Sequence, residues 1–108
     1  MVFVLFLMRL TIHNPKDNSW TALRKAGYVP QGQSQGQQGY VRSLFGSGYP
    51  RFHIYVERER PGEELVFTLH LDQKKPSYEG SHAHSGDYDG EVVQKESERV
   101  KEIFSSEV

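Results

Sequence analysis

Two runs of alternating apolar residues flank the dipeptide Pro61-Gly62, and this arrangement constrains the fold more than any other feature of the chain. Alternation with a period of two is typical of a strand that buries one face, and a Pro-Gly pair between two such runs predicts a hairpin. A two-residue loop at Pro61-Gly62 and a four-residue loop over residues 60–63 give the same register, with Ile54 opposite Leu69. The apolar residues of the two runs are Phe52, Ile54, Val56, Leu65, Phe67, Leu69 and Leu71.

The same register places the polar residues of the hairpin on the opposite face of the sheet. His53 lies directly across from His70, and Tyr55 lies across from Thr68, so we expect the paired Cβ atoms to be about 5 Å apart. Asp72 continues this face at the end of the second strand. Because a slip of one residue would bury the polar set and expose the apolar set, the alternation specifies the register strongly.

The remaining segments predict one small α+β domain that spans residues 1–108. Residues 20–26 predict a short helix, residues 40–45 a strand and residues 91–104 an amphipathic helix. Residues 30–39 are rich in Gln and Gly and predict a flexible loop. The expected fold is a three- or four-stranded antiparallel sheet in α-β-β-β-α order, with both helices on one face and the other face open.

The first eight residues are all apolar, and they allow two interpretations. They fit an extra N-terminal strand, which would be the fourth strand of the sheet. They also fit translation from an upstream start codon, in which case Met8 is the working initiator and residues 1–7 are not native. The segment does not fit a signal peptide, because it has no basic leader and no small-residue cleavage site.

Composition excludes several classes of function. The chain has no cysteine, so disulfides, thiol catalysis and cysteine-based zinc sites are excluded, and we expect a cytoplasmic protein. Thirteen basic and fourteen acidic residues give a net charge of −1, which argues against a dedicated non-specific nucleic-acid binder. No apolar run reaches the length of about 18 residues that a membrane span needs, so we expect no membrane segment.

A long polar loop over residues 72–90 carries further side chains suited to chemistry, among them His82, His84 and Tyr88. Imidazoles from two adjacent strands and from this loop, together with a carboxylate, are ligands that zinc and similar divalent metals use. An open coordination position at such a metal would activate water. We therefore expect a zinc or manganese site whose ligands are His53, His70, Asp72, His82 and His84.

The same residues also fit chemistry without a metal. His53 or His70 would act as general acid or base, because histidine titrates near neutral pH, and Tyr88 is a further catalytic candidate. Arg42 on the neighbouring strand and Tyr55 would contact a phosphorylated ligand. A purely structural role, in which the histidines and tyrosines pin the long loop to the sheet, stays open beside these interpretations.

Two short pieces resemble known nucleic-acid-processing families. Leu23-Arg-Lys-Ala-Gly-Tyr28 is similar to the end of the first helix of HicA-type mRNA interferases, and Phe52-His-Ile-Tyr55 is similar to their strand with the active histidine. The α-β-β-β-α order is similar both to these toxins and to double-stranded-RNA-binding domains. The resemblance implies that His53 is catalytic and acts on RNA. His82-Ala-His84 with Tyr88 resembles the metal-binding pair and nucleophilic tyrosine of HUH nucleases.

The leading functional hypothesis is therefore a His/Asp site on the open sheet face that holds a divalent metal. It would bind or act on a phosphorylated or nucleic-acid ligand, as a hydrolase of the phosphodiesterase or ribonuclease kind. The alternative is a non-catalytic module for interaction with RNA or protein, in which the loop of histidines and tyrosines is structural.

Overall fold

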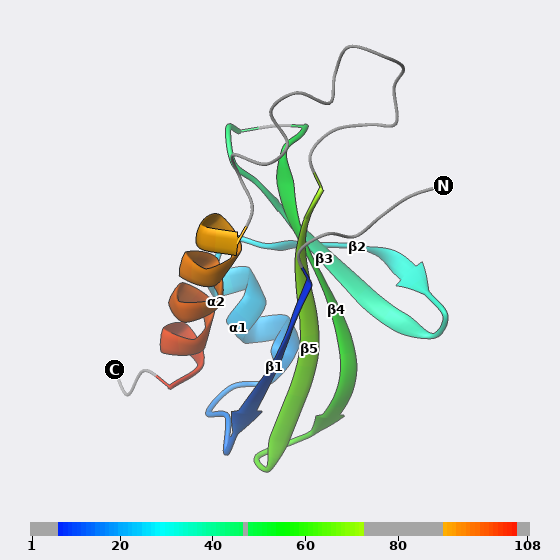
Figure 1. Cartoon of the computed structure of the whole chain (residues 1–108). Coiled ribbons are helices and arrows are strands. Elements are labelled where there is room, and N and C mark those ends of the chain that lie inside the picture. The colour runs from blue at the N-terminus through cyan, green and yellow to red at the C-terminus, as the bar shows by residue number, and fades with distance from the viewer. Residues whose placement is uncertain (1–6, 47, 73–89, 106–108) are drawn as a thin grey trace.

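The computed structural model describes residues 7–46, 48–72 and 90–105. Within them the chain forms five strands and two helices (Figure 1). In chain order the elements are β1 (Leu7–His13), α1 (Ser19–Lys25), β2 (Val29–Ser34), β3 (Gln37–Ser43), β4 (Arg51–Arg60), β5 (Glu64–Asp72) and α2 (Gly90–Ser105). Neither of these helices is long and apolar enough to cross a membrane.

The five strands form one antiparallel sheet in the order β1-β5-β4-β3-β2. Both helices lie on the same side of this sheet (Figure 1), and among the described elements no helix covers the other side. The predicted α+β class and antiparallel sheet are confirmed. The predicted count of three or four strands is wrong, and the element order is β-α-β-β-β-β-α rather than α-β-β-β-α.

The first of the additional strands, β1, lies at one edge of the sheet and pairs with β5. It runs over Leu7–His13, which is later in the chain than the apolar segment expected to form it. Leu10 and Ile12 of β1 are buried in the core, because their side chains turn toward the helices. Residues 1–6 lie outside the described residues, so the alternative start at Met8 stays a prediction.

The second additional strand, β2, falls in the segment 30–39 that was expected to be a loop. This segment instead forms a hairpin with β3, closed by Gln35-Gly36. Both turn residues have positive φ, 54° and 81°, which gives the backbone twist that tight two-residue hairpins favour. Every residue of β2 is exposed, so no apolar alternation marks it in the sequence. Backbone pairing with β3 forms this strand, and the loop prediction is wrong.

The predicted register of β4 and β5 is confirmed where the polar residues lie, with His53 paired to His70. The turn itself differs from both predicted loops, because Arg60 pairs with Glu64 and leaves a three-residue loop between them. A bulge at Glu57 adds one residue to β4. The odd loop length and the bulge cancel each other, so the strands regain the predicted register beyond the bulge.

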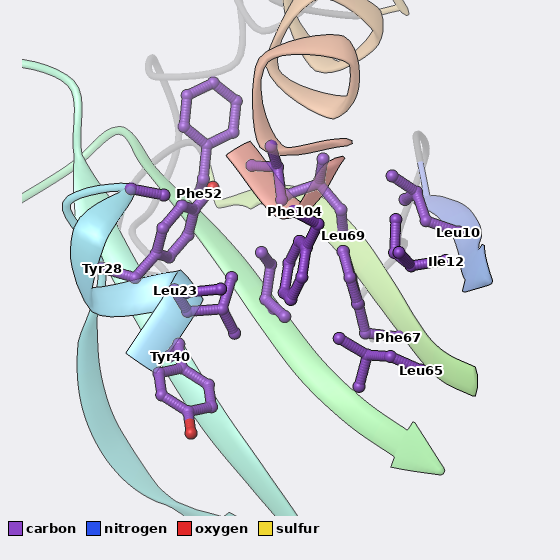
Figure 2. Close-up of a cluster of buried hydrophobic side chains, with 14 of the residues drawn as sticks. Leu10, Ile12, Leu23, Tyr28, Tyr40, Phe52, Leu65, Phe67, Leu69 and Phe104 are labelled. Carbon is purple, nitrogen blue, oxygen red and sulfur yellow. The ribbon is translucent and has the colours of Figure 1, made fainter. Parts of the chain in front are cut away.

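The hydrophobic core fills the space between the helices and the sheet (Figure 2). Phe67 of β5 and Phe104 of α2 pack with their ring centroids 6.0 Å apart, and Leu23 of α1 is fully buried. Burial of these apolar side chains fixes which face of the sheet turns toward the helices. Residues of the opposite parity in β4 and β5 must therefore point to the helix-free face.

A buried ionic cluster connects α2 to this core. The Glu96 carboxylate accepts a hydrogen bond from the Tyr28 hydroxyl at 2.6 Å and two from the Arg99 guanidinium at 3.0 and 2.9 Å. Arg99 also donates to the carbonyl of Ala26 at 2.6 Å, and the Arg42 Nε lies 3.9 Å from Glu96. Burial, and then the negative charge of Glu96, raise the pKa of Tyr28, so its hydroxyl stays a donor.

Candidate metal centre

Three side chains from two adjacent strands meet on the helix-free face of the sheet. Asp72 lies at the end of β5, and its two carboxylate oxygens face different histidines. Oδ2 is 3.2 Å from His53 Nδ1 on β4, and Oδ1 is 3.0 Å from His70 Nε2 on β5. The two imidazole centroids are 5.2 Å apart. One nitrogen from each ring and one carboxylate oxygen lie within 4.8 Å of one another, as the ligands of one metal ion would.

The strand geometry explains why these three residues converge. His53 and His70 are directly paired across β4 and β5, so their side chains leave the sheet on the same side. Asp72 follows His70 by two residues and therefore shares its face. The alternation of the neighbouring apolar residues, such as Ile54 and Leu69 on the core face, leaves these polar positions no other orientation.

The cluster is shielded from solvent although no described helix covers it. The exposed fractions of the side chains are 11% for His53, 14% for His70 and 26% for Asp72. The ring of Tyr55 stacks on His53 at a centroid distance of 4.4 Å and an interplanar angle of 27°. On the neighbouring strand β3, Gly39 leaves room for the imidazole of His53. A Cβ at this position would lie 3.2 Å from His53 Nε2.

The carboxylate of Asp72 is the negative charge of the cluster. Burial alone would raise the pKa of Asp72, but the hydrogen bonds from His53 and His70 outweigh this effect and hold the pKa well below its ordinary value of 3.8. An ionised carboxylate only accepts hydrogen bonds, so the two imidazole nitrogens that face Asp72 carry the hydrogens. Each ring then directs its second nitrogen away from Asp72.

Those second nitrogens make no hydrogen bond to any described residue. Among the described residues, the buried side-chain nitrogen and oxygen atoms that make no hydrogen bond are His53 Nε2, His70 Nδ1 and Arg51 Nε. All three belong to residues around Asp72, since Arg51 Nε lies 3.6 Å from Asp72 Oδ2. Buried polar atoms are normally satisfied, so a concentration of unsatisfied ones indicates a place where water, an ion or a ligand completes the bonding.

The structure brings together four of the residues named by the sequence, which are His53, His70, Asp72 and Tyr55. It does not bring Arg42 to them. Arg42 pairs with Phe52 of β4, which belongs to the core, and therefore lies on the helix-covered face beside Glu96. The parity of Arg42 was visible in the sequence, but the register of β3 against β4 was not.

The other predicted site residues lie in the segment 73–89, outside the described residues. These are the candidate ligands His82 and His84 and the candidate catalytic residue Tyr88. Their part in the site stays a prediction.

Two residues of the site were missed in the sequence. Arg51 pairs with Asp72 across the strands, and its position two residues before His53 would have placed it on this face by parity alone. Gly39 lies directly opposite Tyr55, and nothing in its polar, glycine-rich surroundings distinguishes it from a loop glycine. Only the pairing of β3 with β4 shows that it leaves room for an imidazole.

The chain matches no family model, no curated protein and no solved structure. The resemblance to HicA-type toxins and double-stranded-RNA-binding domains therefore stays a prediction from two short sequence pieces. The function has to be argued from the geometry of the cluster itself.

Proposed function

We propose that this protein binds one divalent cation, zinc or manganese, through His53 Nδ1, His70 Nε2 and a carboxylate oxygen of Asp72. The observation that carries the proposal is that one donor atom from each of these three residues, on two directly paired strands, lies within 4.8 Å of the other two. Two imidazoles and one carboxylate suit zinc, and they suit manganese when water or a ligand fills the remaining positions.

Three protein ligands leave at least one coordination position open. A cation held in this way lowers the pKa of a bound water or polarises an oxygen of a substrate, and both effects favour hydrolysis. The site supports this chemistry further because its side chains are largely shielded from solvent, where electrostatic interactions are stronger than in water. We propose a metal-dependent hydrolase as the activity that such a centre suits best.

Metal binding would move protons within this site, because the cation would need the lone pairs of the two nitrogens that face Asp72. In the metal-free protein the two facing imidazole nitrogens donate their hydrogens to Asp72. With a cation in place of these hydrogens, each neutral ring would carry its hydrogen on the outer nitrogen, His53 Nε2 or His70 Nδ1. The affinity for metal is therefore expected to fall at acidic pH, where protons compete for the same nitrogens.

A second candidate function needs no metal. The contacts of 3.2 and 3.0 Å from Asp72 to the two histidines are those of a carboxylate that orients an imidazole for general acid–base catalysis. In this arrangement His53 or His70 would act as the general acid or base. This alternative predicts the same positions for loss of activity but no dependence on metal.

Calorimetric titration with zinc and with manganese separates the two proposals. The wild-type chain, stripped with a chelator, should bind one equivalent of one of these metals. The double substitution His53→Ala/His70→Ala should weaken binding by more than the 10- to 100-fold that loss of an outer-shell partner causes. His13→Ala is the matched control, because this exposed histidine at the end of β1 lies outside the cluster and its removal should change nothing.

Asp72→Asn provides a second test that keeps the shape of the site. The variant should remain folded by far-UV circular dichroism and still lose metal affinity, because it removes the only charged ligand of the three. Equal affinity of the wild type, the double variant and Asp72→Asn would refute a metal site at these residues. The pair His82→Ala/His84→Ala then tests whether the long loop adds the ligands that the sequence predicts.

A further inference from the structure

We infer that Arg51 binds the phosphoryl group of a small phosphorylated ligand that also coordinates the cation. This inference rests on the proposed metal site, and it names the class of ligand that the site takes. Three observations on the Arg51 guanidinium support the inference: it lies beside the three proposed metal ligands, it is largely buried, and its Nε makes no hydrogen bond to a described residue.

Arg51 is held at the edge of the cluster. Its guanidinium carbon lies 4.4 Å from the centroid of the Tyr49 ring, a distance at which the ring face stabilises a cation. Its Nε lies 3.6 Å from Asp72 Oδ2, which is close enough for attraction but too long for a hydrogen bond. That Nε is buried and makes no hydrogen bond within the described part of the chain, and 19% of the side chain is exposed.

The charges of the site indicate which kind of group would accept a hydrogen bond from the Arg51 guanidinium. A guanidinium has only donors, so the unsatisfied Nε needs an acceptor. With a cation in the cluster, the charge of Asp72 would be shared with that cation, and the cation and the Arg51 guanidinium would be two neighbouring positive groups. An anion that touches both removes this repulsion. A phosphoryl group has three oxygens, so one can coordinate the cation while two meet the planar guanidinium.

The surroundings favour a small ligand over a nucleic acid. Three other arginines of β1 and β4, which are Arg9, Arg58 and Arg60, each lie near a carboxylate. Arg9 bonds Glu57 at 3.1 Å, and Arg58 and Arg60 lie 3.9 and 3.4 Å from Glu64. A polyanion needs a row of available cations, and the net charge of the chain is −1. Arg51 also lies near a carboxylate, with its Nε 3.6 Å from Asp72, but Asp72 is the carboxylate that a bound cation would share. Of these four arginines, Arg51 is therefore the one whose guanidinium a phosphoryl group would meet next to the metal.

The test has two stages, so that failure of the metal site and failure of this inference are distinguished. The first stage titrates metal into wild type, Arg51→Gln and Arg58→Gln, where Arg58 serves as a control on the same strand. All three proteins should bind metal, and Arg51→Gln should bind it at least as tightly as wild type because a nearby positive charge is gone. Absence of metal binding in wild type would refute the proposed function, and this inference with it.

The second stage titrates phenyl phosphate, benzoate and a single-stranded RNA oligomer into the metal-loaded proteins. Phenyl phosphate should bind wild type and Arg58→Gln alike, and Arg51→Gln should bind it about 10- to 100-fold more weakly, as expected for loss of a charge-assisted contact. Unchanged phenyl phosphate affinity in Arg51→Gln would overturn the inference. So would benzoate binding as tight as that of phenyl phosphate, or tighter RNA binding with a steep salt dependence.

Discussion

The buried hydrogen bond between Tyr28 and Glu96 should contribute measurably to the stability of the fold. The bond is 2.6 Å long, both groups are buried, and the acceptor is a carboxylate. Tyr28→Phe removes only the hydroxyl oxygen and keeps the ring in its place. Hydrogen bonds to charged groups contribute about 1.5–3 kcal/mol, so we expect a loss of about 2 kcal/mol in the free energy of unfolding.

The remaining contacts of Glu96 limit the loss to this range. Arg99 still bonds both carboxylate oxygens in the variant, at 3.0 and 2.9 Å, so Glu96 does not become an unpaired buried charge. An unpaired charge would cost several kcal/mol more. In a domain of this length, a loss of 2 kcal/mol lowers the melting temperature by about 8–16 °C.

Thermal and urea unfolding of Tyr28→Phe measure this loss. Tyr55→Phe is the matched control, because it removes a hydroxyl for which the described residues provide no hydrogen bond, and it should change the free energy of unfolding by less than about 0.5 kcal/mol. A double-mutant cycle with Glu96→Gln should show coupling between the two positions. If Tyr28→Phe is as stable as the control, the buried bond does not contribute as argued.

Two further predictions concern the site. Because the folded-state pKa of Asp72 lies below its ordinary value of 3.8, its ionised form stabilises the fold above that pH and loses this effect as pH falls toward the lowered value. Acid unfolding of Asp72→Asn should therefore depend less on pH below about 4 than that of wild type, whereas Asp17→Asn, at an exposed ion pair, should follow wild type. Gly39→Ala would place a Cβ 3.0 Å from the Gln31 carbonyl oxygen and 3.2 Å from His53 Nε2. Urea unfolding should show a loss of about 1–3 kcal/mol in the free energy of unfolding. A variant as stable as wild type would refute the close packing of β3 against β2 and β4 at Gly39.

Part of the site could be predicted because it depends on a local pattern. The alternation in β4 and β5 requires Ile54 and Leu69 to share the buried face, and this requirement alone sets His53 against His70. The prediction holds although the turn was wrong, because the bulge at Glu57 compensates for the odd loop length. The energy of burying the apolar face decides the register, and the turn adjusts to it.

Pairings between distant segments were not visible in the sequence. The pairing of β1 with β5 buries Leu10, and the pairing of β3 with β4 sets the face on which Arg42 lies. Neither pairing can be predicted from the residues of one strand alone. β2 has no buried side chain, and its backbone pairing with β3 is the only signal of a strand. Glu96 looks like any polar residue of an amphipathic helix until Tyr28 and Arg99 surround it.

The sequence by itself thus determined that a hairpin presents two histidines and an aspartate on one face, because period-two alternation and the cost of burying polar groups leave a single register. Only the tertiary structure decided which other side chains reach that face. It left the open space at Gly39 beside the imidazoles and kept Arg42 on the helix-covered face, because strand order and long-range pairing follow from the packing of the whole core.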